Sequence, residues 1–188
     1  MANKIILGFV GEISSGKGTA CQYLKEKYGA PSYRFSGILR DILGRLYLPI
    51  VRDNMQHMSQ TLRKNFGQDT LARVIAEDVN KDSAELIAVD GVRREPDIKY
   101  LRRFAGFSLI YLTADQPIRY ERIIKRGENV DDTSKTFEQF QQDERAEAEI
   151  HILETGQTAN FTINNNGTIE QLHQQIEDIL KTIKAKNN

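Results

Sequence analysis

Residues 11–19 read Gly-Glu-Ile-Ser-Ser-Gly-Lys-Gly-Thr, and this stretch decides how the rest of the chain is interpreted. It follows a nearly continuous apolar run, Ile5–Val10, and precedes a segment with helical spacing at Ala20, Leu24 and Tyr28. It fits the pattern Gly-x-x-x-x-Gly-Lys between a strand and a helix. Glycines let backbone N–H groups turn toward phosphate oxygens, and the new helix directs its positive end at the same anion. We therefore predict a phosphate-binding loop.

One position departs from the general pattern of such loops. Lys17 is placed to reach the β- and γ-phosphates, and a Ser or Thr that ligates Mg²⁺ usually follows the lysine directly. Here Gly18 follows Lys17, and Thr19 comes one place later. We expect the Thr19 hydroxyl to lie at the phosphates, and Thr19 is a candidate metal contact. The expected ATP-binding residues of the loop are Gly11, Ser14, Ser15, Gly16, Lys17, Gly18 and Thr19.

Apolar runs alternate with helical patterns along the chain. The runs at 5–10, 86–89, 109–112 and 161–163 are expected strands, and 32–35 is a weaker fifth. Continuous apolar runs suit strands that are buried on both faces of a parallel sheet. The alternation predicts an α/β fold of three layers, with a five-stranded parallel sheet between helices. About three helices are expected before the chain returns to the sheet at residue 86, which predicts a lobe over residues 36–82.

Composition limits the class of protein. The chain has 188 residues, of which 39% are hydrophobic and 28% charged, as in one globular domain spanning 1–188. Lys+Arg and Asp+Glu both total 26, and this balance argues against a nucleic-acid partner. No apolar run is long enough to span a membrane. Cys21 is the only cysteine, so we expect no disulfide and a cytoplasmic location.

The Gly-Lys-Gly-Thr sequence resembles the nucleoside monophosphate kinases of the adenylate kinase type. Residues 35–40, Phe-Ser-Gly-Ile-Leu-Arg, are similar to the family segment Ser-Thr-Gly-Asp-x-Leu-Arg, although this chain is one residue shorter there and lacks the Asp. The resemblance implies that Ser36 and Arg40 contact the phosphate acceptor. An N-cap serine followed by a solvated arginine is the alternative interpretation.

The segment Asp90-Gly-Val-Arg-Arg94 resembles the Asp-Gly-x-Pro-Arg of adenylate kinases. It is closer to the Asp-Gly-Ile-Arg of an archaeal group of adenylate-kinase-related proteins of unassigned substrate. The resemblance implies that Asp90 holds Mg²⁺ through water and that Arg93 or Arg94 binds the acceptor phosphate. Residues 62–72 also look like the acceptor lobe of that group and of deoxynucleoside monophosphate kinases, which makes Arg63 and Arg52 candidate acceptor contacts.

Arg119, Arg122 and Arg126 are spaced by three and four residues and would share one helix face. In nucleotide kinases the corresponding helix leads into a lid. The resemblance implies that Arg119 and Arg126 stabilise charge on the transferred phosphoryl group, within a short lid over residues 119–145. It also suggests that Asn165, in the turn after the last strand, lies near the adenine of ATP. An ordinary basic helix face and a plain polar turn are the alternatives.

These features predict an enzyme of the nucleoside monophosphate kinase type, which uses ATP and Mg²⁺. The expected catalytic residues are Lys17, Asp90, Arg119 and Arg126, and the expected metal contacts are Thr19 and Asp90. The expected acceptor is a nucleoside or deoxynucleoside monophosphate, bound by Ser36, Arg40, Arg63, Arg93 and Arg94. We expect a monomer or homodimer with small-molecule nucleotide substrates. Two alternatives remain: a dephospho-coenzyme-A-kinase-like or other small-molecule kinase, and a nucleotide-binding regulator with slow ATPase activity.

Overall fold

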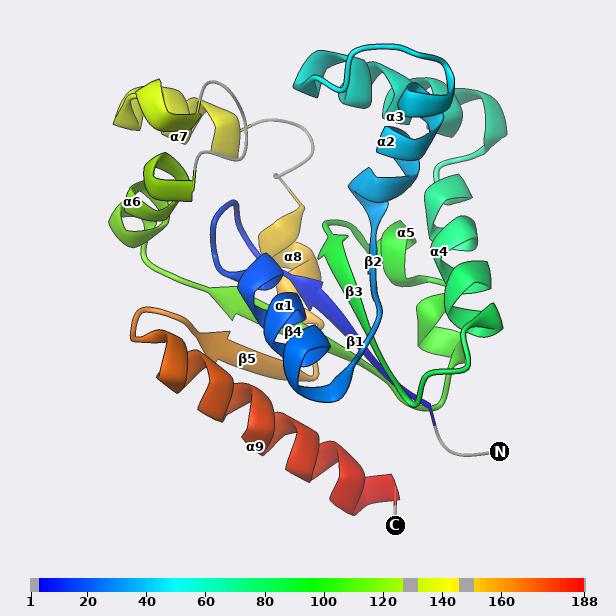
Figure 1. Cartoon of the computed structure of the whole chain (residues 1–188), viewed down its shortest axis with the longest axis vertical. Helices are drawn as coiled ribbons and strands as arrows, with labels where there is room; N and C mark the ends of the chain where they lie inside the picture. The colour runs from blue at the N-terminus through cyan, green and yellow to red at the C-terminus, as the bar shows by residue number, and fades with distance from the viewer. Residues whose placement is uncertain (1–3, 127–131, 146–150, 188) are drawn as a thin grey trace.

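A computed structural model of the chain describes residues 4–126, 132–145 and 151–187 (Figure 1). Residues 127–131 of the expected lid lie outside this range, as does the side chain of Arg52. Five parallel strands form one sheet in the order β2-β3-β1-β4-β5. The strands are β1 (Ile5–Val10), β2 (Ser32–Arg34), β3 (Leu86–Val92), β4 (Phe107–Thr113) and β5 (Phe161–Asn164). The expected α/β sheet is confirmed.

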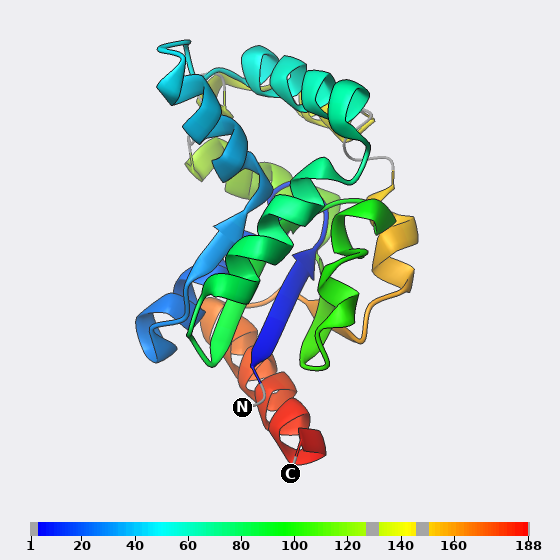
Figure 2. The same ribbon diagram turned by 90° about the vertical axis from the view of Figure 1, so that its right-hand side faces the viewer.

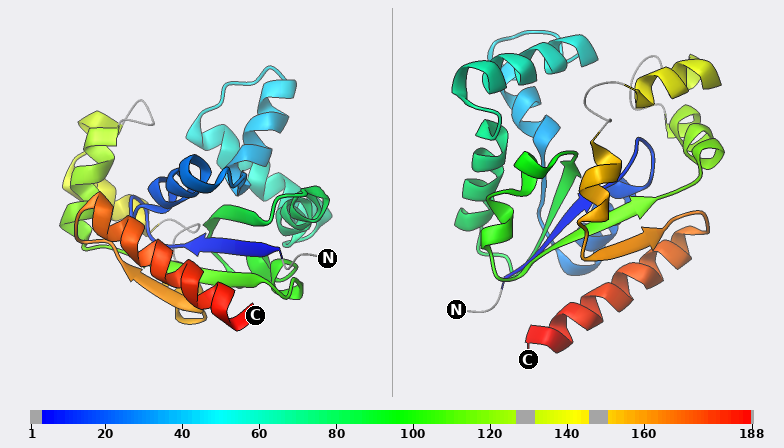
Figure 3. Two further views of the ribbon diagram at one scale, coloured as in Figure 1. Left: turned by 60° about the horizontal axis from the view of Figure 1, so that its bottom comes forward. Right: turned by 180° about the vertical axis from the view of Figure 1, so that it is seen from behind.

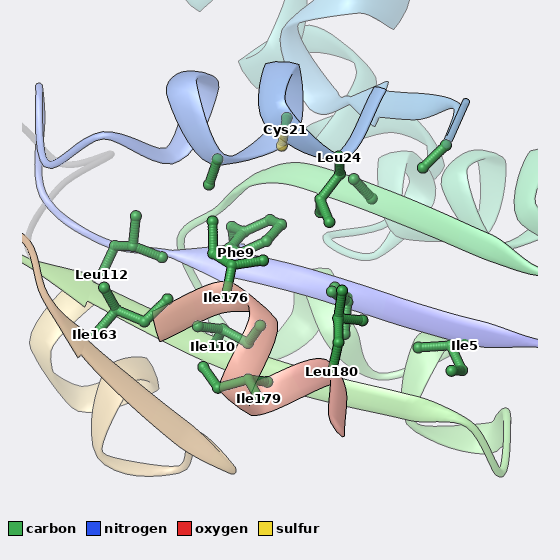
Figure 4. Close-up of a cluster of buried hydrophobic side chains, with 14 of the residues drawn as sticks. Ile5, Phe9, Cys21, Leu24, Ile110, Leu112, Ile163, Ile176, Ile179 and Leu180 are labelled. Carbon is green, nitrogen blue, oxygen red and sulfur yellow. The ribbon is translucent and has the colours of Figure 1, made fainter. Parts of the chain in front are cut away.

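Two helices cover one face of the sheet: α1 (Lys17–Tyr28) and α9 (Ile169–Asn187). Figure 4 shows Phe9 of β1 between Leu24 of α1 and Ile176 of α9, within a continuous apolar layer. All six residues of β1 are buried, because helices cover both faces of this central strand. Burial of this kind supplies most of the free energy of folding, and it fixes where the loop after β1 emerges.

The opposite face is covered by α4 (Thr70–Lys81), α5 (Glu95–Ile98), the 3₁₀ turn η1 (Leu101–Arg103) and α8 (Ile152–Gln157). Figure 2 shows α4 and α5 on this side, and the view from behind in Figure 3 shows α8 in front of the sheet. The apolar stripe of α4, Leu71, Ile75 and Val79, is buried there. The expected lobe over 36–82 therefore includes one helix that lies against the sheet.

Two helical units rise beyond the carboxyl ends of the strands, with the loop between β1 and α1 lying between them (Figure 1). One unit is α2 (Phe35–Arg45) with α3 (Arg52–Phe66). The other is α6 (Gln116–Arg126) with the 3₁₀ turn η2 (Asp132–Ser134) and α7 (Phe137–Glu144). Because the strands of a parallel sheet direct their carboxyl ends to one edge, this is where such folds bind ligands.

Local signals in the sequence place several helix ends correctly. The capping boxes at Thr136–Gln139 and Thr168–Gln171 both form their paired hydrogen bonds. Gly67 ends α3 with a φ of 104°. One expectation is wrong in detail. Phe35 begins α2 instead of ending a strand.

Candidate functional site

Close packing of backbone fixes the shape of the phosphate-binding loop. A Cβ at Gly11 would lie 2.2 Å from the carbonyl oxygen of Leu112, so no larger residue fits. Gly16 has a φ of 111°, and a Cβ there would lie 2.2 Å from Asn165 Nδ2. That same Nδ2 donates a hydrogen bond of 2.8 Å to the Ser15 carbonyl oxygen. The strand ends therefore hold the loop in a conformation that glycine alone permits at two positions.

The Lys17 ammonium lies over this loop. Its Nζ donates to the carbonyl oxygens of Gly11, at 2.7 Å, and Glu12, at 2.9 Å. The Glu12 carboxylate is anchored separately, since Oε1 accepts a 2.5 Å hydrogen bond from the Tyr111 hydroxyl. Burial, with a smaller contribution from Glu12, raises the pKa of Tyr111 to about 12, so that hydroxyl remains a donor. Lys17 is therefore held at a loop whose Glu12 is itself fixed by Tyr111 of β4.

A cavity of about 1480 Å³ runs from the phosphate-binding loop to the helices on either side. Its lining includes seven arginines and three lysines against four carboxylates, although the whole chain has a formal net charge of zero. Ligand pockets are usually about 300–1,000 Å³, so there is room for more than one small molecule. A cavity with such an excess of cations suits polyanionic ligands.

Most of the residues that sequence reasoning selected line this one cavity. They are Ser14, Gly16, Lys17, Gly18, Thr19, Ser36, Arg40, Arg63, Asp90, Arg93, Arg94, Arg126 and Asn165. Gly11, Ser15 and Arg119 lie outside its lining. The Ser15 Oγ is buried without a hydrogen-bond partner among the described residues, so this serine would meet a ligand through its backbone. The individual roles of all these residues stay predictions.

The acceptor candidates surround a buried carboxylate. Asp97 is 3% exposed and accepts hydrogen bonds from the backbone N–H groups of Arg93 and Arg94, each at 3.1 Å. Burial raises the pKa of Asp97 against the opposing effect of these donors. Arg63 lies 3.6 Å from Asp97. The Nε of Arg63 and Nη2 of Arg94 are buried and make no hydrogen bond within the described chain, so a bound anion would satisfy both.

The three arginines on α6 have different surroundings. Arg119 is 6% exposed, donates to the carbonyl oxygens of Ala114 and Ile13, and pairs with Glu144 of α7. Its guanidinium therefore joins α6 and α7 to the phosphate-binding loop. Arg122 and Arg126 line the cavity instead.

Arg122 was not selected as a site residue from the sequence. Its Nη2 donates to the Asn165 carbonyl oxygen at 2.8 Å, and burial lowers its pKa. Its Nη1 is buried without a partner among the described residues. Arg126 is more open, with 43% of its side chain exposed and Asp132 at 3.6 Å. Helical spacing placed the three arginines together, but it carries no signal that separates Arg119 from the other two.

Arg34, which sequence reasoning missed, pairs with Asp90. The buried Asp90 Oδ2 accepts hydrogen bonds from Arg34 Nε, at 2.8 Å, and Nη2, at 2.7 Å. The two residues are register partners, with Arg34 at the end of β2 and Asp90 two residues before the end of β3. Cys21 lies nearby, and its pKa rises to about 12 through burial and the charge of Asp90, so it is no thiolate nucleophile. The sequence signal that could have identified Arg34 was its position at the carboxyl end of an expected strand.

Asp90 and Thr19 line the cavity with Lys17, and one carboxylate with one hydroxyl fits a magnesium ion that also binds substrate phosphates. Among the described residues there is no group of three His, Cys, Asp or Glu side chains that could hold a metal by themselves. When bound with ATP, Mg²⁺ neutralises charge on the phosphates. The residues therefore fit a metal that is shared between protein and nucleotide.

The fold and the loop define a P-loop nucleotide-binding protein of kinase-like architecture. The chain belongs to the AAA domain family, whose family model matches residues 7–161, and to the archaeal UPF0200 proteins. It is 30% identical to the UPF0200 protein of Staphylothermus marinus over 159 residues, covering 85% of this chain and 82% of the relative. It is 28% identical to that of Sulfurisphaera tokodaii over 179 residues, covering 95% and 97%.

Solved structures share the architecture at low sequence identity. A shikimate kinase from Bacteroides thetaiotaomicron is 12% identical, with a TM-score of 0.64 over 96% of this chain and 98% of its own. A gluconokinase from Sinorhizobium meliloti is 15% identical, with a TM-score of 0.59 over 99% and 97%. At these identities the likeness establishes the fold alone. Separately, none of the helices in the described part of the chain is long and apolar enough to cross a membrane.

Proposed function

We propose that this chain transfers the γ-phosphoryl group of ATP to a nucleoside or deoxynucleoside monophosphate. The observation that carries the proposal is that one continuous, cation-rich cavity joins the phosphate-binding loop to a second set of arginines. A nucleotide donor needs the loop, and a second phosphorylated ligand accounts for the cations at the other end. We further propose that the enzyme is cytoplasmic, acts on free nucleotides and works as a monomer or homodimer.

On the donor side, the loop amides and Lys17 hold the β- and γ-phosphates. The base of ATP would lie toward Asn165 and Arg122, at the end of the cavity that α9 borders. Asp90 and Thr19 would hold the metal that accompanies ATP. The Lys17 ammonium, already bound to two carbonyl oxygens of the loop, needs little rearrangement to meet the phosphates.

On the acceptor side, Arg40, Arg63 and Arg94 would bind the phosphate of the monophosphate, with Arg93 and Ser36 beside them. Guanidinium groups suit this task because their planar fork binds phosphate oxygens in pairs. The unsatisfied N–H groups of Arg63 and Arg94 support an anion at this place. An acceptor phosphate is itself the nucleophile, so these residues need to position it and screen its charge, without a general base.

Three arginines would act during transfer. Arg126 lines the cavity at the lid and can approach the migrating phosphoryl group. Arg119 would contribute by holding α6 and α7 against the loop through Ile13 and Glu144. Arg122 would fix the Asn165 turn at the donor. Charge that develops on the phosphoryl oxygens is then stabilised by groups that are already in place.

The test measures ADP formation from ATP and Mg²⁺ with a panel of acceptors. The panel contains ribo- and deoxynucleoside monophosphates, dephospho-coenzyme A, shikimate, gluconate and no acceptor. We expect at least tenfold stimulation by one nucleoside monophosphate. Stimulation by dephospho-coenzyme A or by a sugar-like acceptor would replace the proposal with another small-molecule kinase. Equal slow ADP release in every reaction would favour a regulator with ATPase activity and remove the acceptor-site assignments.

The matched variants are Lys17→Ala and Lys25→Ala, which both remove a lysine from α1. Lys25 is exposed and lies outside the cavity. We expect Lys17→Ala to abolish the stimulated activity while the protein stays folded by circular dichroism, and Lys25→Ala to match wild type. Wild-type turnover in Lys17→Ala would contradict the mechanism.

A further inference from the structure

A guanidinium lies beside the position where this loop departs from the general pattern. Residue 18, where a Ser or Thr usually ligates the metal, is Gly18. A Cβ built on Gly18 would lie 3.4 Å from Arg34 Nη2, the one neighbouring atom within 4 Å among the described residues outside the backbone of α1. The space next to the metal-ligand position is thus bordered by a cation.

Contacts with Asp90 hold this guanidinium in place. Its Nε and Nη2 both bind Oδ2 of Asp90, which is buried, and the two residues face each other across the β2–β3 register. Arg34 also forms the N-cap of α2 with an extended backbone, so its main chain is fixed between a strand and a helix. Its side chain is 42% exposed and lines the cavity together with Lys17. It is therefore oriented by protein and accessible to a ligand.

We propose that Arg34 is a nucleotide-binding residue that takes, at the donor phosphates, the place of the missing metal-ligating hydroxyl. The planar fork of a guanidinium can bind a carboxylate along one edge and a phosphate along another. Asp90 orients Arg34 toward the phosphates, and Gly18 leaves room for it. The inference rests on the proposed function only in requiring that ATP binds at this loop.

Electrostatics predicts how the removal of Arg34 would change ATP binding with and without Mg²⁺. A guanidinium next to the phosphates contributes most when no metal neutralises them, and less when Mg²⁺ is bound. Removal of Arg34 should therefore weaken metal-free ATP binding more than Mg²⁺-dependent binding. If Arg34 only neutralised Asp90, its removal would leave the carboxylate unpaired, so metal-free ATP would bind more weakly through repulsion and Mg²⁺·ATP would bind more tightly. A lower Kd with Mg²⁺ in an Arg34 variant would therefore overturn the inference.

The experiment is calorimetric titration of the full chain with ATP, once with excess Mg²⁺ and once with EDTA at equal ionic strength. For Arg34→Gln we expect the Kd in EDTA to rise about tenfold or more, and the Kd with Mg²⁺ to change by about threefold or less. The same Kd for wild type and Arg34→Gln in EDTA would overturn the inference. Arg45→Gln, which removes an exposed arginine of α2 outside the cavity, is the matched control and should stay within about twofold of wild type.

Loss of Arg34 leaves the buried Asp90 without its partner, so that variant could fail to fold. Gly18→Ser leaves the Arg34–Asp90 pair intact and supplies the usual hydroxyl. We expect it to raise the ratio of Kd in EDTA to Kd with Mg²⁺ about tenfold, since the metal gains a ligand and the serine side chain takes the space between the guanidinium and the phosphates. An unchanged ratio in Gly18→Ser would count against the inference. Arg34→Lys should keep part of the metal-free binding, because it retains the charge without the planar fork.

The outcomes separate the two proposals. Wild-type protein that binds no ATP under either condition would overturn both the proposed function and this inference. Protein that binds ATP, with Arg34 making no difference in EDTA, would overturn the inference alone. Turnover is not used as a readout, so an unidentified acceptor does not affect the result.

Discussion

The two ends of the cavity are built by different means. At the proposed donor end, backbone sets the shape, and Gly11 and Gly16 occupy positions where a Cβ would collide with neighbouring atoms. At the proposed acceptor end, side chains from separate elements set the shape, chiefly Arg40, Arg63 and Arg94. A backbone cradle can bind any nucleoside triphosphate. A cluster of side chains can change with single substitutions while the fold stays intact, so we expect specificity to lie at that end.

The strongest test of the backbone-built end is Gly16→Ala. The positive φ and the 2.2 Å approach to Asn165 Nδ2 oppose any side chain at this position. We expect the free energy of unfolding to fall by roughly 3 kcal/mol and ATP affinity to fall by about 100-fold or more. Chemical denaturation and ATP titration measure the two effects.

Gly44→Ala is the matched control, because nothing lies within 4 Å of a Cβ built at this exposed position of α2. Alanine there should leave ATP binding unchanged and raise stability by about 0.4–1 kcal/mol. Near-equal behaviour of the two alanine variants would break the distinction between the ends.

Two arginines of α6 test whether a side chain, like the backbone of the loop, can hold the proposed donor end in shape. Arg119→Ala removes the link between Glu144, Ile13 and Ala114. Because Arg119 is buried, we expect the free energy of unfolding to fall by about 2 kcal/mol. Arg126→Ala, at a side chain that is 43% exposed but lies 3.6 Å from the buried Asp132, should lower stability by about 1 kcal/mol while lowering kcat about tenfold.

Thermal and chemical unfolding, with turnover measured on the same samples, distinguish these two arginines. If Arg119→Ala lowered kcat with no loss of stability, Arg119 would act directly on the phosphoryl group, as the resemblance to nucleotide kinases implies.

A substitution at the side-chain-built end should act on one substrate only. Arg40→Gln removes a cavity-lining guanidinium of α2 without touching the loop. We expect KM for the acceptor to rise about tenfold, equivalent to about 1.4 kcal/mol, with KM for ATP within about twofold. Initial rates with each substrate varied in turn give both constants. Equal increases in the two KM values would show that the ends are coupled.

The smallest effect is expected at Glu177 on α9, in a cluster that ties α9 to α1. Burial alone would raise the pKa of Glu177, but hydrogen bonds from Tyr23, Tyr28 and Lys27 outweigh it and lower the pKa to about 2. The pKa of a glutamate in an unfolded chain is about 4.3. The stabilising contribution is therefore present above about pH 4.3 and is lost as the pH falls toward 2.

Glu177→Gln should lower the free energy of unfolding by about 1 kcal/mol or less at pH 7, since the cluster is near the surface. The difference from wild type should vanish near pH 2, and neither KM should change. Urea titrations at several pH values measure this. A difference that grew as the pH fell would contradict the assignment.

Local sequence signals predicted most of the fold. The apolar runs gave the five strands, and the capping boxes at Thr136 and Thr168 gave two helix starts, because each signal acts within a few residues of itself. The donor loop was also predictable, since one contiguous motif sets its backbone. The boundary at Phe35 was mistaken, because a short aromatic run does not show where β2 ends and α2 begins.

The rest of the site depends on contacts between distant segments. Arg34 and Asp90 are 56 positions apart and meet only because β2 and β3 pair in parallel. Arg119 differs from Arg126 through its contact with α7, which helical spacing does not encode. Such partners follow from tertiary packing, so the sequence predicted the types of residue at the site better than their individual roles.

The charge distribution has a consequence for how substrates arrive. Ten cationic and four anionic side chains line the cavity of a chain whose formal net charge is zero, so the remainder carries six more acidic than basic groups. The charge of the molecule is therefore unevenly distributed: the cavity attracts anions, and the rest of the protein repels them. Anionic nucleotides would be guided toward the opening during diffusion, and association would slow as added salt shortens the screening length below about 10 Å.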